Sequence, residues 1–254
     1  MTQRRIVLVT GGAKGVGRGI SASFLAAGDV VVCCGREAPE SLPSVEGRGA
    51  EFIAADVRDS AARDGLFDEI LRRHGRLDVL VNNAGGSPFV MADKASPRFH
   101  ESMIQLNLLA PLHLAQKANA QMQQQDSGGV IVFVGSVSAL RPSPGSAAYG
   151  AAKAGVLNLV SSLAVEWAPK VRVVAVSPGM VRTEQSELHY GDEAGIKAVA
   201  STIPMQRLAE PGDVGDACLW VASKQAGYLS GTNLTLHGGG ERPAFLAAAS
   251  VNQG

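Results

Sequence analysis

Short apolar runs and longer amphipathic segments alternate along the chain. Apolar runs of about four to eight residues bounded by turn residues are typical of buried strands, whereas an apolar position every third or fourth residue indicates a helix. The pattern predicts strands at 6–9, 29–34, 51–55, 77–81, 130–134, 171–177 and 233–237. It predicts helices at 15–27, 60–74, 99–122, 149–168 and 214–222, with a break at Pro111, because proline removes a backbone donor.

Strands that alternate with helices in this way indicate repeated strand–helix–strand units with parallel strands. The predicted fold class is therefore α/β, a Rossmann-type doubly wound parallel sheet. No repeat, linker or low-complexity block interrupts the pattern, so we expect residues 1–254 to form a single domain.

Composition narrows the range of partners. The chain has 254 residues, of which 46% are hydrophobic, and 23 basic residues balance 23 acidic ones. Such a balance gives no net field to attract nucleic acid or an anionic membrane, so we expect small molecules or other copies of the chain as partners. Neither a signal peptide nor a membrane span is visible from the start M-T-Q-R-R onward, which favours the cytoplasm.

Cysteine and histidine spacing points away from metals. Cys33, Cys34 and Cys218 form no C-x-x-C pair, which argues against a zinc site and against disulfides. The five histidines show no ligand spacing either. We therefore expect no catalytic metal and a reducing compartment.

The loop T-G-G-A-K-G-V-G at 10–17 lies between the first predicted strand and the first predicted helix. Glycines at 11, 15 and 17 permit a tight turn and close backbone approach, and the following helix offers free amides to a phosphate. This context is the one that a dinucleotide-binding loop requires. The alternative is a glycine turn with a purely structural role.

Tyr149 and Lys153 are four residues apart in an alanine-rich segment, which on a helix places both side chains on one face. A nearby ammonium favours the phenolate, so the pattern predicts a lowered pKa for Tyr149 and a role as general acid or base. Ser136 follows the strand at 130–134, where its hydroxyl can donate to a substrate oxygen. The alternative is an ordinary surface pair of tyrosine and lysine.

These motifs, in this order, resemble the short-chain dehydrogenase/reductases in their single-domain form, and among them members like 3-oxoacyl-carrier-protein reductase. The resemblance runs from Ile6 to about Gly240. It rests on the glycine loop, A-D-V at 55–57, N-N-A-G at 82–85, Q-L-N-L around Asn107, P-G-x-x-x-T at 178–183 and I-P-M-Q-R-L-A-E-P-G-D-V at 203–214.

The resemblance implies a role for each matching position. The implied catalytic residues are Asn107, Ser136, Tyr149 and Lys153. Asn107 is expected to hold a water that relays protons toward Lys153; a buried asparagine that only satisfies backbone groups is the alternative. The implied cofactor contacts are Gly11, Lys14, Gly15, Val16, Gly17, Arg36, Asp56, Val57, Asn83, Ala84, Gly85, Tyr149, Lys153, Pro178, Gly179, Val181 and Thr183.

The resemblance also implies which part of the cofactor some of these residues contact. Asp56 and Val57 are implied to contact the adenine, although an aspartate after a strand is also commonly a helix cap. Lys153 is implied to bind the nicotinamide ribose, and Thr183 the carboxamide.

The charge after the second strand bears on the choice of cofactor. An acid at this position accepts from the ribose 2′-hydroxyl of NAD, whereas arginine accommodates the 2′-phosphate of NADP. Here the strand is followed by Arg36, and Lys14 lies in the glycine loop. We therefore expect NADP(H) to be preferred, with NAD(H) possible, since Glu37 partly opposes Arg36 and a solvent-facing Arg36 is the alternative.

The predicted reaction interconverts a carbonyl and a secondary alcohol by hydride transfer. Segment 184–206 matches the family's mobile lid. Its Leu188, Tyr190, Ile196 and Val199, with Phe89, Val90, Met91 and Leu140, suggest an apolar substrate such as a ketone, a 3-oxoacyl thioester or a steroid-like molecule, unless they only pack against one another. His189 is expected at the rim.

Other functions remain open. They are an NAD(H)-dependent alcohol dehydrogenase, a dinucleotide-binding redox sensor or scaffold without turnover, and non-redox use of the cofactor. The full catalytic set argues against a sensor, and the short chain argues against a sugar epimerase.

The resemblance also implies a homotetramer or homodimer formed through the helix at 99–122 and the alanine-rich helix that contains Trp167. The tail at 241–254 extends past the recognisable core. Phe245 and Leu246 in it are expected either to dock on a neighbouring subunit or to belong to a frayed end.

Overall fold

The computed structural model describes residues 4–249, and its centre is a parallel sheet of seven strands. The strand order is β5-β2-β1-β6-β7-β8-β9, so the direction of winding reverses between β1 and β6. Ligands of such sheets bind outside the carboxyl ends of the strands at that reversal. The strands are β1 (Ile6–Thr10), β2 (Val30–Gly35), β5 (Glu51–Ala54), β6 (Val79–Asn82), β7 (Gly129–Val134), β8 (Val171–Pro178) and β9 (Thr232–Leu236).

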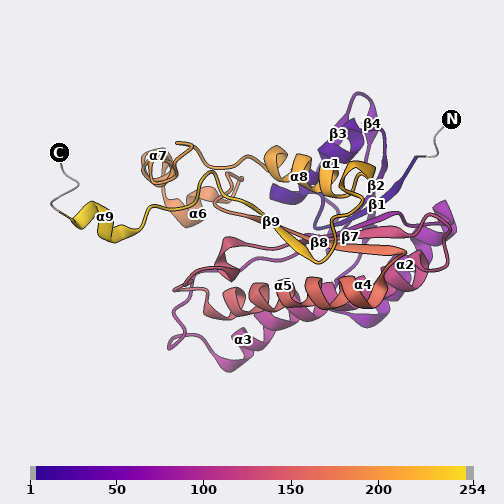
Figure 1. Ribbon diagram of the computed structural model, residues 1–254, viewed down its shortest axis with the longest axis horizontal. Coiled ribbons are helices and arrows are strands. Elements are labelled where there is room, and N and C mark those ends of the chain that lie inside the picture. Colours follow the sequence, from indigo (N-terminus) through magenta and orange to yellow (C-terminus); the bar gives the residue numbers. More distant parts are fainter. Residues whose placement is uncertain (1–3, 250–254) are drawn as a thin grey trace.

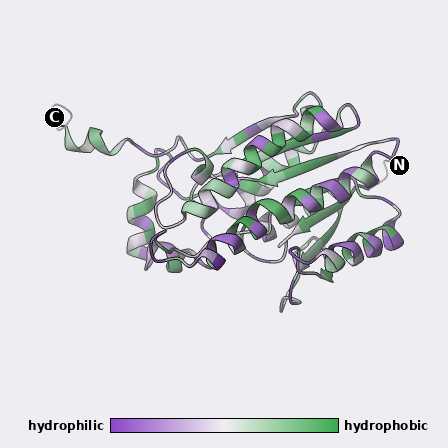
Figure 2. Cartoon of the chain, turned by 90° about the horizontal axis from the view of Figure 1, so that it is seen from below, coloured by the Kyte–Doolittle hydropathy of each residue, from purple (hydrophilic) through white to green (hydrophobic). Residues whose placement is uncertain are grey.

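Helices cover both faces of the sheet, as Figure 1 shows. Helices α1 (Gly15–Ala26) and α8 (Pro211–Val221) lie on one face, and α2 (Ser60–His74), α4 (Ala110–Met122) and α5 (Ala147–Trp167) on the other. Each face therefore has its own hydrophobic core, and the strands between them are the most uniformly apolar part of the chain (Figure 2). The predicted doubly wound α/β fold is confirmed.

Close approach of α1 and α8 depends on glycine. A β-carbon at Gly19 would lie 2.3 Å from the Pro211 carbonyl carbon, and one at Gly215 would lie 2.6 Å from the Gly19 carbonyl oxygen. Any larger residue at either position would push the two helices apart. This packing fixes α1, whose first turn faces the carboxyl ends of the strands.

The predicted break at Pro111 is wrong. Helix α3 (Pro97–Ile104), a π-helical turn (Gln105–Leu109) and α4 follow one another, and Pro111 lies in the first turn of α4. The chain stays helical across Pro111, and the backbone widens into a π-helical turn directly before it, where the Ala110 N–H bonds the Gln105 carbonyl oxygen. The irregularity lies upstream instead, and it includes Asn107.

Several short elements were not predicted from the sequence. The strands β3 (Ser44–Val45) and β4 (Arg48–Gly49) form a small hairpin, and 3-10 turns occupy Val137–Ala139 and Lys224–Ala226. The segment expected to be a lid contains α6 (Ser186–Tyr190) and α7 (Glu193–Ser201). In the tail, α9 (Ala244–Ala248) extends away from the body (Figure 1), whereas residues 250–254, like residues 1–3, lie outside the described part.

Helix α5 is long and apolar enough to cross a membrane by length and composition alone. The buried core helix of a globular protein passes the same test. Here α5 packs its apolar face on the sheet through Val156, Val160 and Leu163, and it carries the buried Lys153. The fold accounts for its apolar character.

Candidate active site

A cleft of about 420 Å³ lies at the carboxyl ends of the strands, beside the reversal of strand order. Loops after β1, β6, β7 and β8 form it, together with the start of α5 and the beginning of the lid. It brings together most of the predicted site residues, namely Gly11, Lys14, Gly15, Val16, Gly17, Asn83, Ala84, Gly85, Ser136, Tyr149, Lys153, Pro178, Gly179, Val181 and Thr183. Arg36, Asp56, Val57 and Asn107 are not part of its lining.

The glycine loop forms a cradle that side chains would fill. Gly11 and Gly15 have φ angles of +63° and +49°, which favour glycine. A β-carbon at Gly17 would lie 2.1 Å from the Gly11 carbonyl oxygen. A phosphate can therefore come close to the backbone at the start of α1, and the shape of the loop fits a dinucleotide.

The loop after β6 is bonded to the glycine loop. The N–H groups of Asn83 and Ala84 donate to Thr10 Oγ1 at 3.0 and 2.9 Å, and Asn83 Nδ2 donates to the Thr10 carbonyl oxygen at 2.9 Å. The Asn83 side chain is thus occupied by the backbone of the loop. This network holds two walls of the cleft at a fixed separation.

Tyr149 and Lys153 lie on one face of α5, as predicted. Lys153 Nζ is 5.6 Å from the centre of the Tyr149 ring and donates to the Val134 carbonyl oxygen at 2.8 Å. Ser136 lies two residues after the end of β7. It is buried and shares a side-chain hydrogen bond with Tyr149. A hydroxyl, a phenol and an ammonium therefore meet at one wall of the cleft.

The protonation of this group differs from the prediction. Burial raises the pKa of Tyr149, and the hydrogen bond with Ser136 only partly opposes that effect. Burial lowers the pKa of Lys153 to about 8. The prediction of a lowered tyrosine pKa is therefore wrong, because desolvation of the buried phenol outweighs the hydrogen bond with Ser136.

Asn107 lies in the π-helical turn and is fully buried. Its Nδ2 donates to the carbonyl oxygens of Gly86 and Met103, and its Oδ1 accepts from the Gly86 N–H at 2.9 Å. Asn107 therefore supports the loop behind the cleft. The water relay toward Lys153 stays a prediction.

The region expected to bind adenine contains a residue that the sequence analysis missed. Arg58 donates to both carboxylate oxygens of Asp56, at 3.0 and 2.6 Å, and this pairing lowers the pKa of Asp56 to about 2. The signal was present in the sequence, since an arginine two residues beyond an aspartate can turn back onto it. Arg36 is exposed, and within residues 4–249 the structure gives it no ion-pair partner.

The lid contributes more to the cleft than predicted, because Glu184, Gln185 and His189 line it beside Thr183. His189 is exposed, which agrees with a rim position. By contrast, Ile196 is buried against Ile203 and Leu208, with Tyr190 and Val199 packed on them. Of the four apolar lid residues predicted to cover the substrate, Leu188 is the one that is strongly exposed, at 82%.

Among residues 4–249, no group of three or more histidine, cysteine or acidic side chains is arranged to hold a metal ion. Cys33, Cys34 and Cys218 are free and buried.

Comparison with known proteins gives a consistent family. Residues 11–241 match the family model described as enoyl-(acyl carrier protein) reductase. The 3beta-hydroxysteroid dehydrogenase 1 of Eggerthella lenta is 34% identical over 92% of this chain and 93% of its own. The 3-oxoacyl-[acyl-carrier-protein] reductase of Haemophilus influenzae is 31% identical over 93% and 98%.

Solved structures agree. ElxO with NADP bound is 32% identical, has a TM-score of 0.85, and is matched over 93% of this chain and 98% of its own. One longer relative, 35% identical, is matched over 43% of its own length. The glycine loop, the Ser136, Tyr149 and Lys153 group and these similarities together assign the chain to the short-chain dehydrogenase/reductase family of oxidoreductases, in its single-domain form.

Proposed function

We propose that the protein is an NADP(H)-dependent oxidoreductase that interconverts a carbonyl and a secondary alcohol by hydride transfer. One observation carries the proposal. Ser136, Tyr149 and Lys153 line the same cleft as the glycine loop. A substrate oxygen held in this cleft would meet both a proton donor and a dinucleotide.

The chain's own residues supply the acid–base chemistry. Tyr149 has a raised pKa, so at neutral pH the phenol holds its proton and can donate it to a carbonyl oxygen. Ser136 hydrogen-bonds the same oxygen and orients it. Lys153, below about pH 8, keeps a positive charge beside the phenolate that forms.

The bound nicotinamide supplies or accepts the hydride. Thr183 is suited to orient its carboxamide. The Thr183 N–H donates to Ser186 Oγ, and Thr183 Oγ1 accepts from the Gln185 N–H, which leaves the hydroxyl hydrogen to donate. Gly179 and Pro178 lie at the same part of the cleft.

Charge at the adenosine end supports NADP(H) over NAD(H). Lys14 and Arg36 are exposed, and both follow strands at the carboxyl edge of the sheet. Asp56, whose carboxylate would repel a 2′-phosphate, is already neutralised by Arg58. Two exposed cations suit a phosphate dianion.

The surroundings of the cleft support a medium-sized apolar substrate. A second cavity of about 1150 Å³ meets the cleft at Gly179. Leu140, Met180 and Met205 line it, and Phe89 and Met91, which follow β6, are exposed. Ketones, 3-oxoacyl thioesters and steroid-like ketones fit such a lining better than a densely charged sugar.

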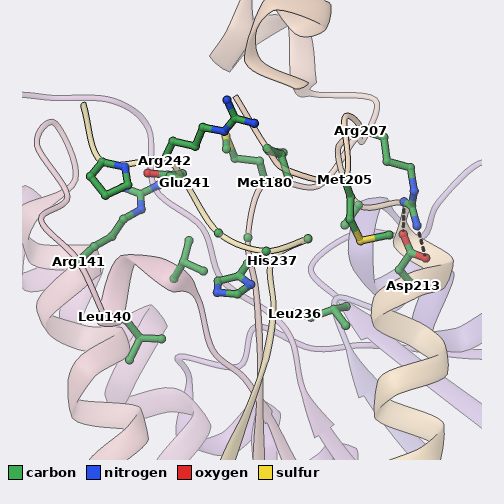
Figure 3. Close-up of a pocket in the computed structure, with 18 of the residues that line it drawn as sticks. Leu140, Arg141, Met180, Met205, Arg207, Asp213, Leu236, His237, Glu241 and Arg242 are labelled. Atoms are coloured by element: carbon green, nitrogen blue, oxygen red, sulfur yellow. Dashed lines mark hydrogen bonds and ion pairs between the residues drawn. The ribbon is translucent and has the colours of Figure 1, made fainter. Parts of the chain in front are cut away.

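The polar margin of this second cavity is electrically balanced. Arginines lie on both sides of it, as Figure 3 shows, but Arg141 pairs with Glu241 at 2.7 Å and Arg207 with Asp213 at 2.6 Å. Paired arginines offer less attraction to an anionic substrate. The margin therefore adds no argument for a highly charged ligand.

The test is oxidation of NADPH and of NADH, followed by nicotinamide absorbance, against ketones, 3-oxoacyl thioesters, quinones and steroid-like ketones. We expect turnover with NADPH for one apolar class, and loss of that turnover in Tyr149→Phe. Binding of both cofactors without turnover of any class would favour the redox sensor instead. Turnover that survives Tyr149→Phe would remove the proposed proton donor.

We also propose a cytoplasmic homotetramer or homodimer. Small residues form the outward stripe of α5, which suits close packing against a second helix; the stripe consists of Ala151, Ala154, Asn158, Ser162 and Val165. Val165 is 81% exposed, whereas Trp167 packs against the core. Light scattering after gel filtration tests the assembly, and a Val165→Glu variant is expected to yield monomers.

A further inference from the structure

Glu184 reaches from the start of the lid back to the glycine loop. The Gly15 N–H donates to Glu184 Oε1 at 2.9 Å, and the two residues are 169 positions apart in the sequence. Gly15 is the first residue of α1. The carboxylate therefore lies at the positive end of the helix dipole, where an anion is favoured.

Local capping of α1 is weak, which makes the distant carboxylate significant. Lys14 stands at the N-cap position and makes no side-chain capping bond, and the first turn of α1 has no acidic residue. A β-carbon placed on Gly15 would lie 3.8 and 3.9 Å from the two Glu184 oxygens. Glu184 thus supplies, from another part of the chain, an acceptor for one of the N–H groups that have no partner within the first turn of α1.

The same amide is one that a dinucleotide pyrophosphate needs. In this fold the pyrophosphate lies at the N-terminus of the helix after the glycine loop. One N–H cannot serve two strong acceptors at once, and two anions at one position repel each other. Glu184 and a pyrophosphate oxygen therefore compete for Gly15.

Glu184 is also fixed to the lid. The Thr183 N–H donates to Ser186 Oγ at 2.8 Å, the Ser186 N–H donates to the Thr183 carbonyl oxygen, and Ser186 is buried. Beyond this turn, Ile196 and Ile203 of the lid belong to a small hydrophobic cluster that also includes Leu208. Movement of Glu184 away from Gly15 is thereby linked to the first turn of α6.

We propose that Glu184 is a latch that the cofactor displaces. When Glu184 binds Gly15, it ties the lid to the glycine loop. When the pyrophosphate takes the Gly15 amide, the carboxylate leaves, so the position of the lid depends on whether cofactor is bound. The exchange weakens cofactor affinity and speeds cofactor release. This inference rests on the dinucleotide site of the proposed function.

The experiment measures the dissociation constants of NADPH and NADH by nicotinamide fluorescence in the wild type, Glu184→Gln and Glu184→Ala. Removal of the charge should tighten binding about two- to fivefold, the range expected for an anion at a helix N-terminus. The factor should be equal for both cofactors, because both carry the pyrophosphate. An effect confined to NADPH would overturn the latch, since it would point to the 2′-phosphate.

Glu187→Gln is the matched control, because Glu187 is exposed in α6, three residues beyond Glu184, and its substitution removes the same charge. Its dissociation constants should stay at wild-type values; a shift equal to that of Glu184→Gln would reduce the effect to overall charge. Weaker binding in Glu184→Gln would show that Glu184 helps to hold the cofactor, and would also overturn the proposal.

Hydrogen exchange of residues 184–206 gives a second readout. In the protein without added cofactor, the lid of Glu184→Gln should exchange faster than that of the wild type, and saturating NADPH should abolish the difference. Equal exchange rates before addition would contradict a latch. If the wild type binds neither cofactor, the proposed function fails together with the latch; if it binds and turns over but Glu184→Gln changes nothing, the latch alone fails.

Discussion

Two parts of the site are built in different ways. One is the group of Ser136, Tyr149, Lys153 and the supporting Asn107, which we call the floor of the cleft, and the other is the lid at 184–206. On the floor, Lys153 and Asn107 are buried, and their polar atoms are bonded to backbone groups. In the lid, Leu188 and His189 on α6 and Glu184 just before it are exposed, and only a small hydrophobic cluster around Ile196 and Ile203 packs the lid. The floor therefore has the rigidity that acid–base chemistry requires, whereas the lid can change position and sequence at little cost to the fold.

The sharpest test of this comparison removes the same atom from both regions. Tyr149→Phe deletes the proton donor of the floor, and turnover should fall by about 10²- to 10⁴-fold with cofactor binding unchanged. Tyr190→Phe deletes a phenol oxygen from the lid and should change turnover less than threefold, on the order of one uncritical hydrogen bond. Steady-state kinetics with NADPH and cofactor titration of both variants provide the measurement. Equal losses would mean that the lid takes part in the chemistry.

The exposed Arg36, which follows β2 outside the cleft lining, gives the next test. Arg36→Asp should weaken NADPH binding by roughly 10- to 100-fold relative to NADH, because a charge-assisted hydrogen bond to the 2′-phosphate is lost and repulsion replaces it. Arg98→Asp, an exposed arginine of α3, makes the same charge change as a control. If the ratio of the two dissociation constants is unchanged in Arg36→Asp, the 2′-phosphate is recognised elsewhere.

The protonation state of Lys153 should appear in the pH dependence of kcat. The pKa of Lys153 is lowered to about 8, so its charge is present below that pH and is lost above it, while the raised pKa of Tyr149 keeps the phenol protonated. The rate of carbonyl reduction should therefore fall above about pH 8, approaching tenfold per pH unit. Measurement of kcat from pH 6 to 10 tests this, with Lys197→Met in the lid as a control that retains the profile. A rate that rises through this range would contradict the assignment.

The fold was predictable because its signals are local. Apolar runs placed the seven strands within about two residues, and the spacing of Tyr149 and Lys153 placed both on one face of α5. Short polar elements such as the hairpin at 44–49 carry no comparable periodicity.

Features that depend on tertiary burial were beyond sequence reasoning. The spacing of Tyr149 and Lys153 gave their neighbourhood but not their desolvation, which decides the direction of the tyrosine pKa. The contact of Glu184 with Gly15 joins positions 169 residues apart, and no local pattern announces it. The packing of Ile196 inside the lid likewise became visible only when its neighbours Ile203 and Leu208 were in place.

The smallest expected effect concerns the lid surface. Leu188 is 82% exposed and precedes His189, which lines the cleft, so Leu188→Ser should leave folding and kcat unchanged and raise KM for an apolar substrate about two- to fivefold, the effect of losing part of one apolar contact. Ile196→Ser is the opposing case, because a hydroxyl would enter the buried core of the lid, and loss of lid structure should lower kcat and raise KM together. Kinetics of both variants over a range of substrate concentrations separate these outcomes. An identical response would mean that the exposed and buried faces of the lid act as one, and the contrast between a rigid floor and an adaptable lid surface would then be wrong.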